Sequence, residues 1–339
     1  MLSDQTMVLE AARAGDHQAF QLVTDPYRHE LLVHCYRMLG SVEDAEDILQ
    51  ETLLRAWRRL DSFEGRAPLR AWLYKIATNA ALDALERRRA RALPTAIHPF
   101  ADPRAALPPP AAETIWLEPL PDGLVDERPD VNPEARYDAH ESVTLAFLAT
   151  LQNLPGRQRA VLILRDVLGW NASQVAEALE MTVVAVNSAL QRARARLKQS
   201  SAYDSRYAAA RDDEGTASLL SRYVAAWEAA DSNALVALLR EDAVLTMPPL
   251  PAWYRGRADI QSFLDTHLFT GHARRPLRLT ATRANGAPAF AVYQADEMGV
   301  YRPAGLQVLT IQHGQISEIN DFLCFDDRLF SRFGLPLVG

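Results

Sequence analysis

The sequence predicts a multi-domain fold in which two all-α domains precede one α+β domain. The chain has 339 residues, more than one ordinary hydrophobic core supports. Apolar residues recur at helical spacing through residues 7–90 and again through 136–199. Beyond residue 216, helical runs give way to alternating stretches rich in β-branched and aromatic residues, which is typical of an α+β domain. We expect domains at 1–91, 136–200 and 216–339, joined by linkers at 92–135 and 201–215.

The clearest helix of the first domain lies in SVEDAEDILQETLLRAWRRL. Its apolar positions recur with the spacing of one helix face, at Ala45, Ile48, Leu49, Thr52, Leu53, Ala56 and Trp57. Ser41 suits the N-cap, and Glu43 and Asp44 favour the positive end of the helix dipole. On the other side, Asp44, Asp47 and Glu51 form an acidic stripe. The stripe is either a solvated face or a docking surface.

A second helix is predicted in PLRAWLYKIATNAALDALERRRAR, after the loop DSFEGRAP. Basic and aromatic residues interleave along this loop and helix: Arg66, Arg70, Trp72, Tyr74, Lys75, Asn79, Asp83, Arg87, Arg88, Arg89 and Arg91. Such a surface suits phosphate binding and the stacking of unpaired bases. Trp72 fits the buried stripe of the helix equally well, so both interpretations of it stay open.

Charge is distributed unevenly, although the net charge is −7. Residues 52–91 hold ten Lys/Arg against four Asp/Glu, and residues 155–200 hold seven against three. Residues 101–141 reverse the balance, with three against ten. Two basic blocks separated by an acidic one favour two nucleic-acid-binding modules joined by a segment that does not bind.

The segment between the two basic blocks is rich in proline, with ten prolines in residues 92–135. Proline lacks the backbone donor that a regular helix or central strand needs, so we expect a mostly extended acidic linker. Trp116, Leu117 and Leu120 lie inside it and are apolar enough to dock on another surface.

The second basic block contains NASQVAEALEMTVVAVNSALQRARARL, which predicts a helix-turn-helix. We expect a short helix over 173–179, a turn near 180–181 and a longer helix over 182–198. Residues predicted to be buried between the two helices are Val175, Leu179, Val186 and Leu190. The outer face would then carry Asn187, Ser188, Gln191, Arg192 and Arg194, whose side chains can reach base edges or phosphates.

The last third combines helices near 216–229, 232–239 and 257–268 with four alternating runs, RLTATRA, AFAVYQA, GLQVLTIQH and ISEINDFL. Asn285-Gly286 and His313-Gly314 supply hairpin turns between them. No apolar run approaches the length of a membrane span and the N-terminus has no secretory pattern, so we expect a cytoplasmic protein without membrane insertion. Cys35 and Cys324 lie far apart, so neither a disulfide nor a metal site is predicted, and no cofactor is expected.

Taken together, two stretches resemble extracytoplasmic-function sigma factors of RNA polymerase. DAEDILQETLLRAWRRLDSFEGRAPLRAWLYKIATNAALDALERRRAR is similar to their second conserved region, and LPGRQRAVLILRDVLGWNASQVAEALEMTVVAVNSALQRARARL to their fourth. The resemblance implies core RNA polymerase and promoter DNA as partners. One departure is Glu180, where the family usually places glycine in the turn. A positive φ there costs about 1 kcal/mol for a non-glycine residue.

The resemblance also implies roles for individual residues. Core polymerase would be bound by Asp44, Asp47, Gln50 and Glu51. The −10 promoter element would be opened and held by Phe63, Arg66, Trp72, Lys75, Asn79, Asp83 and Arg87. The −35 element would be read by Asn187, Ser188, Gln191, Arg192 and Arg194.

The C-terminal third resembles the SnoaL-like and ketosteroid-isomerase-like cone fold, through SRYVAAWEAADSNALVALLREDAVLTMPPL and YRGRADIQSFL. Tyr223 matches the tyrosine that donates to the oxyanion in the isomerases, but Met247 stands at the position of the general base and Gln307 near the second donor. We therefore expect no catalytic residues and no enzyme activity. A ligand pocket would be lined by Tyr223, Met247, Trp253, Gln307 and Asp321, unless these residues are only core and rim.

These observations favour a sigma factor whose activity is modulated in cis by the cone domain, which would receive a small-molecule or protein signal. Two alternatives stay open. One is a cone-fold enzyme, of isomerase or hydrolase type, that carries DNA-binding helices. The other is a DNA-binding repressor that acts without polymerase, in which the stripe of Asp44, Asp47 and Glu51 would have no role.

Overall fold

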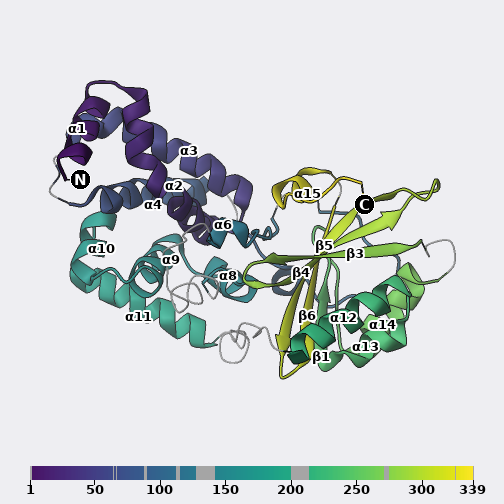
Figure 1. The fold of residues 1–339 in the computed structure, drawn as a ribbon. Helices are drawn as coiled ribbons and strands as arrows, with labels where there is room; N and C mark the ends of the chain where they lie inside the picture. Colours follow the sequence, from purple (N-terminus) through teal and green to yellow (C-terminus); the bar gives the residue numbers. More distant parts are fainter. Residues whose placement is uncertain are drawn as a thin grey trace. The chain divides into compact units, whose positions relative to one another are not determined.

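The structure is a computed structural model that describes residues 2–63, 65, 67–87, 90–111, 115–126, 142–199, 214–270, 275–324 and 326–338. The chain forms two compact units. The helical unit comprises Met1–Arg91, Gly123–Asn132 and Phe147–Tyr203, and the cone unit comprises Ala92–Asp122, Pro133–Ala146 and Asp204–Gly339. Both are drawn in Figure 1. The predicted fold class, helical sigma-type domains followed by an α+β cone domain, is confirmed.

The helical unit is built from helices and short helical turns alone in the part that the structure describes. They are α1 (Leu2–Arg13), α2 (His17–Leu39), α3 (Val42–Arg59), the 3₁₀ turn η1 (Leu60–Ser62), α4 (Leu69–Arg87), α6 (Gly123–Asp126), α8 (Leu145–Gln152), α9 (Gly156–Leu162), the π-helical turn η2 (Ile163–Val167), α10 (Ala172–Leu179) and α11 (Val183–Gln199). No helix in the described residues is both long and apolar enough to cross a bilayer.

The boundary between α2 and α3 is set by two capping residues, Gly40 and Ser41. Gly40 ends α2 with a φ of 73°, a left-handed conformation that glycine adopts without strain. Ser41 then caps α3, its hydroxyl accepting the backbone N–H of Asp44 at 3.1 Å, as predicted. The predicted apolar face of α3 is buried at Ala45, Leu49, Thr52, Leu53 and Ala56 and half-buried at Ile48 and Trp57.

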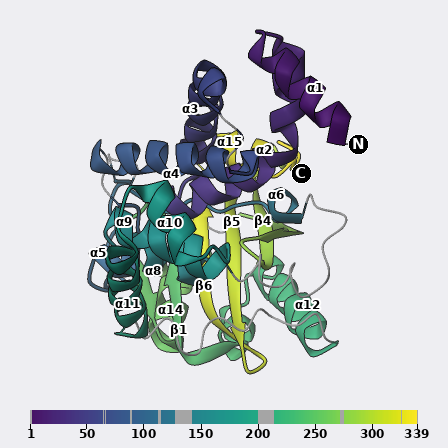
Figure 2. The ribbon, with the colours of Figure 1, turned by 90° about the vertical axis from the view of Figure 1, so that its left-hand side faces the viewer.

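The helix-turn-helix is formed by α10 and α11. Asn171 and Gln174 form a reciprocal capping box that starts α10. The four residues predicted to be buried between the helices are buried: Val175, Leu179, Val186 and Leu190. Glu180 ends α10 with a φ of 53°, so the turn does require the left-handed conformation. In Figure 2, α11 runs alongside α9.

The cone unit contains one six-stranded sheet, with strand order β2-β1-β6-β5-β4-β3. Its elements are α5 (Pro94–Ile97), α12 (Glu214–Glu228), α13 (Ser232–Ala237), β1 (Leu239–Thr246), β2 (Trp253–Arg255), α14 (Arg257–Phe263), the π-helical turn η3 (Leu264–Leu268), β3 (Leu277–Ala284), β4 (Ala287–Ala295), β5 (Tyr301–Gln312), β6 (Gln315–Leu323) and α15 (Arg328–Arg332). The four predicted alternating strands correspond to β3 to β6, and the pairing is antiparallel except between β1 and β6.

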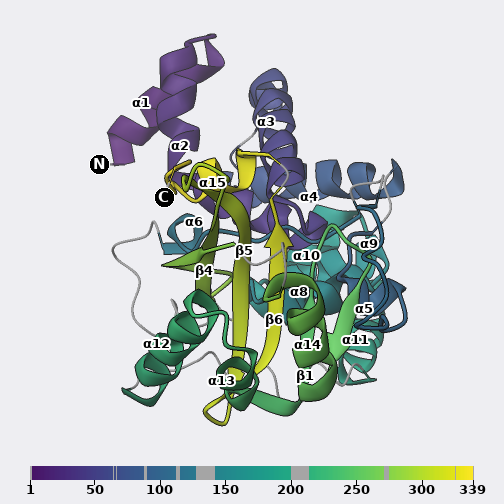
Figure 3. The ribbon, with the colours of Figure 1, turned by 90° about the vertical axis from the view of Figure 1, so that its right-hand side faces the viewer.

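The sheet has two different faces. Figure 3 shows α12, α13 and α14 covering one of them, which we call the helix face. Strand pairing places Trp253 beside Thr246, and Thr246 beside Asn320 on β6, so these three side chains share the opposite face. Tyr254 and Ile319 alternate with them and belong to the core of the helix face.

The proline-rich segment contacts the second face of the sheet at Trp253 and the turn between β3 and β4 near its end. We call its described residues, 92–111 and 115–122, the strap, and this face the strap face. The Trp253 side chain donates from Nε1 to the carbonyl of His98 at 2.7 Å, and the backbone N–H of Ala101 donates to the carbonyl of Trp253 at 2.9 Å. The predicted docking residues Trp116, Leu117 and Leu120 are all buried. The strap is therefore part of the cone unit rather than a free linker.

Candidate nucleic-acid interface and cone site

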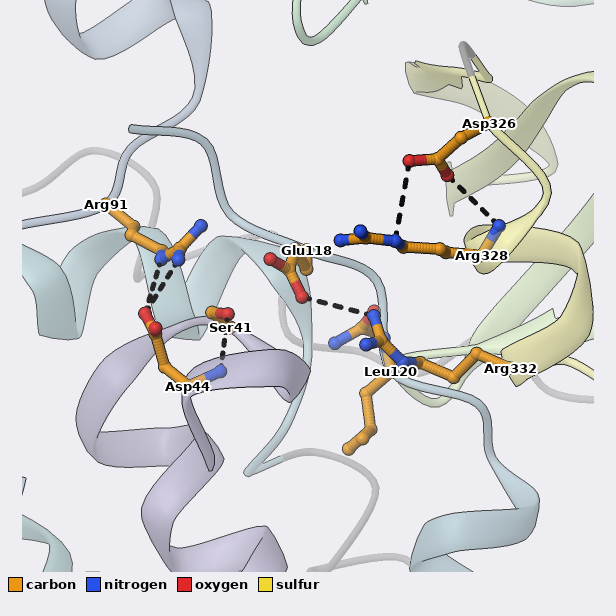
Figure 4. A network of polar contacts seen from close by, with 9 residues as sticks. Ser41, Asp44, Arg91, Glu118, Leu120, Asp326, Arg328 and Arg332 are labelled. Carbon is orange, nitrogen blue, oxygen red and sulfur yellow. Dashed lines mark hydrogen bonds and ion pairs between the residues drawn. The ribbon is translucent and has the colours of Figure 1, made fainter. Parts of the chain in front are cut away.

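The four residues of α3 that were predicted to bind polymerase fall into two groups, two with internal ion pairs and two without any among the described residues. Asp44 is buried and accepts hydrogen bonds from Arg91 Nε at 3.0 Å and Nη2 at 2.7 Å, as Figure 4 shows. Glu51 accepts from Arg55 Nε at 2.7 Å. Asp47 and Gln50 are exposed. Only these last two side chains are directed to solvent without an internal ion pair in the described structure.

An aromatic pair lies at the start of α4. Phe63 is buried, and its ring centroid lies 5.1 Å from that of Trp72, which is itself half-buried. The guanidinium of Arg13 lies 5.9 Å from the Phe63 ring centroid. Trp72 therefore packs on Phe63 while keeping part of its surface exposed. Arg66, also predicted at this site, lies outside the described residues.

Farther along α4, two predicted −10 contacts are engaged inside the helical unit. Lys75 Nζ lies 3.4 Å from Glu180 Oε1, in the turn of the helix-turn-helix. Asp83 Oδ2 accepts from Arg55 Nη1 at 2.9 Å. Asn79 is half-buried and Arg87 is exposed. The face of α4 that carries Lys75 thus lies against α10 in this structure.

The outer face of α11 presents polar side chains. Asn187, Gln191 and Arg192 are exposed, and Ser188 is half-buried. Arg194 differs, because its Nε and Nη2 bind both carboxylate oxygens of Asp166 at 2.9 and 2.7 Å. All five predicted −35 residues are thus exposed or half-buried, and Arg194 is in addition held by a bidentate ion pair.

Arg159, on α9, is a structural centre that the sequence pattern did not single out. It is only 2% exposed. Its guanidinium donates to the carbonyls of Met38, Gln152 and Leu154 and to the Gln152 side chain. Burial lowers the pKa of Arg159 to about 10, so it remains cationic at neutral pH. The buried guanidinium of Arg159 thus links the end of α2 to α9 by hydrogen bonds to carbonyl and amide oxygens.

The turn between β3 and β4 holds two distant segments of the cone unit. Asn285, 1% exposed and with a φ of 55°, accepts the N–H of Leu120 on Oδ1 at 2.9 Å and donates from Nδ2 to the carbonyl of Val143 at 2.7 Å. Beside it, Asp122 accepts the N–H of Gly286 at 2.7 Å. We call these contacts of Asn285 and Gly286 the hairpin clamp. It binds the end of the strap and the segment that leads into α8.

A second contact holds the strap near its end. Glu118 Oε2 lies 3.3 Å from Nη1 of Arg332, on α15 (Figure 4). Both side chains are largely shielded from solvent, since each is 19% exposed. The ion pair therefore reinforces the clamp from the C-terminal helix.

Inside the cone, a buried hydrogen-bonded chain links three of the predicted pocket residues. Tyr223 Oη donates to Gln307 Oε1 at 2.7 Å, and Gln307 Nε2 donates to Asp321 Oδ2 at 3.2 Å. Met247 belongs to the same buried core. Trp253 does not, because β2 turns it to the strap face. Four of the five predicted pocket residues thus lie on the helix face.

The carboxyl group of Asp321 is unusual. Its second oxygen, Oδ1, has no hydrogen-bond partner among the described residues. Burial raises the pKa of Asp321 to about 6, and burial together with the charge of Asp321 raises the pKa of Tyr223. Below pH 6 the carboxyl is therefore neutral while the fold is intact.

The stability of the cone unit is expected to fall as pH rises from about 4 to about 6. In that window the unfolded chain ionises Asp321 while the folded chain keeps the proton, which favours unfolding. Asp321→Asn should flatten this dependence and raise the free energy of unfolding at pH 7 by about 3 kcal/mol. Hydrogen exchange of α12 and β6 amides across pH 4–8 measures it. The matched exposed variant Asp265→Asn should keep the wild-type slope, and an Asp321→Asn slope equal to wild type would contradict the assignment.

A capped helix-turn-helix with a polar outer face, in a unit with a second basic and aromatic helix, defines a DNA-binding regulator of transcription. Comparison with known proteins gives its family. Sigma-70 region 2 matches residues 24–91, Sigma-70, region 4 matches residues 144–197, and the SnoaL-like domain matches residues 220–319. The chain belongs to the extracytoplasmic-function (ECF) sigma factors of RNA polymerase, and it directs transcription as a sigma factor.

Individual relatives show how far the similarity extends. The ECF RNA polymerase sigma factor SigG of Mycobacterium tuberculosis is 46% identical over 325 residues, covering 96% of this chain and 85% of SigG. SigM of the same species is 34% identical over 192 residues, covering 56% of this chain and 81% of SigM. The crystal structure of M. tuberculosis SigJ shares the fold, with a TM-score of 0.58 at 24% identity over 92% of this chain and 98% of SigJ.

Proposed function

We propose that this sigma factor uses three surfaces of its helical unit at a promoter. The exposed side of α3 with Asp47 and Gln50 binds core polymerase, α4 with its preceding loop holds the −10 element, and α11 reads the −35 element. The observation that carries this proposal is the outer face of α11, where polar side chains are exposed on a helix anchored by a buried apolar face.

In the same proposal the cone unit restrains the helical unit in cis. The strap follows α4 along the chain, and Val143 lies two residues before the start of α8. The hairpin clamp binds both the end of the strap and Val143. The cone unit therefore holds the segment that connects the two sigma regions at two separate points. Weakening this grip should favour states in which the regions separate to engage DNA.

Releasing the hairpin clamp is expected to increase promoter-dependent transcription at least threefold. Asn285→Gly removes both side-chain hydrogen bonds but retains the positive φ, so the turn itself survives. Run-off transcription with reconstituted holoenzyme measures the change. The control is His313→Gly, at a residue of positive φ in the turn between β5 and β6, which should behave as wild type. Unchanged or reduced transcription with Asn285→Gly alone would contradict restraint by the cone.

The signal in this proposal is a small molecule that reaches the buried chain of Tyr223, Gln307 and Asp321. Support comes from Oδ1 of Asp321, a buried carboxylate oxygen that has no hydrogen-bond partner among the described residues. Because Met247 offers no proton acceptor at the position of the isomerase base, the cone senses rather than catalyses. The site of action is the cytoplasm, where the proposed partners, core polymerase and promoter DNA, are found.

A further inference from the structure

An apolar side chain lies at the N-terminal end of the proposed DNA-reading surface of α11. Val184, in the first turn of α11, is 75% exposed. Val183 beside it is 41% exposed. A lone exposed valine elsewhere on a protein surface carries no meaning, so its place on the helix decides the interpretation.

Helical geometry places Val184 on the same side of α11 as the polar residues Ser188 and Gln191. Positions four, seven and eleven residues apart share one side of a helix, so Val184, Ser188, Gln191 and Ala195 form a single stripe. The opposite side is buried at Val186, Ala189, Leu190, Ala193 and Leu197. The stripe therefore points away from the helical core, and Val184 is its first residue.

The chemistry of the groove selects what this side chain can recognise. In helix-turn-helix proteins the N-terminal residues of the second helix contact base edges. A valine has no hydrogen-bonding group, and the apolar feature of a base edge in the major groove is the C5-methyl group of thymine. Ser188 and Gln191, next along the stripe, supply the hydrogen-bonding groups for neighbouring bases.

We propose that Val184 is a specificity-determining residue that contacts the C5-methyl group of one thymine in the −35 element. The inference rests on the proposed role of α11 at that element. Loss of one buried methyl contact corresponds to about a fourfold loss of affinity. Val183 lies one position off the stripe and provides a matched control.

The test removes the C5-methyl group of thymine and leaves the base pair unchanged. A −35 sequence is selected with wild-type holoenzyme from a promoter library randomised at that element, and each thymidine in it is replaced in turn by deoxyuridine. We expect one replacement to weaken wild-type binding about fourfold. Val184→Ala should bind the thymidine duplex about fourfold more weakly and ignore that replacement, whereas Val183→Ala should respond as wild type does.

Three results would overturn the inference alone. Two of them are a wild-type holoenzyme that is indifferent to every deoxyuridine and a selected element without thymine. A Val184→Ala holoenzyme that keeps the wild-type response would do the same. The role of α11 is tested separately with Asn187→Ala and Gln191→Ala. If both variants still distinguish the selected −35 element from a scrambled one as wild type does, the proposed function of α11 fails and this inference fails with it.

Discussion

Arg159→Met is expected to lower the free energy of unfolding of the helical unit by about 3 kcal/mol. The substitution keeps an apolar stem but leaves the carbonyls of Met38, Gln152 and Leu154 buried without their donor. An unsatisfied buried acceptor costs about 1–3 kcal/mol, and three of them share this site. The loss should appear as a melting temperature lower by about 10 °C.

Urea unfolding of the full chain measures this loss, and hydrogen exchange at the end of α2 locates it. The matched control is Arg157→Met, since Arg157 is an exposed arginine two residues away on the same helix. Its effect should stay within about 0.5 kcal/mol. Equal stability of the two variants would show that Arg159 does not organise the junction between α2 and α9.

Reversing the charge on the exposed side of α3 is expected to weaken binding to core polymerase about 30-fold. Asp47→Lys combined with Gln50→Lys places two cations where the proposed docking surface is acidic or neutral, and like charges across an interface cost several kcal/mol. Asp44 and Glu51 are unsuitable targets, because their bonds to Arg91 and Arg55 support the fold.

Binding of the full chain to core polymerase at low and moderate salt measures the effect, which should diminish as salt rises. Asp265→Lys changes an exposed acid of the cone unit and should leave core binding unchanged. If the double variant binds core polymerase like wild type, α3 does not form the docking surface.

The helical unit was predictable because its information is local. Helix spacing, the Ser41 cap and the buried stripe of the helix-turn-helix follow from residues within one or two turns of each other. The same reasoning recovered β3 to β6, whose hairpins pair neighbours in the sequence. It did not recover β1 and β2 from alternation: β1 ends in four successive buried residues, and its pairing with β6 joins segments far apart in the chain.

Site residues were predicted by type and face, but not by their long-range partners. The sequence marked Asn285 as a turn residue, yet its bonds to Leu120 and Val143 span 165 and 142 residues. Trp253 was placed in the pocket because no local pattern fixes the register of a three-residue strand, and register decides which face a side chain takes. The sequence did not reveal the ion pair between Arg194 and Asp166, because that contact depends on how α11 packs.

The docked strap has a consequence for the contour length of the connection between the sigma regions. The described residues of the strap, 92–111 and 115–122, pack in the cone unit and add only a fixed distance to the connection. Fully extended, a segment of this length would span about 100 Å. If the cone releases the strap, one molecule gains slack between the modules assigned to the −10 and −35 elements. The grip of the cone would then set the spacer lengths that this sigma factor tolerates, so that a signal could change which promoters are read as well as how strongly.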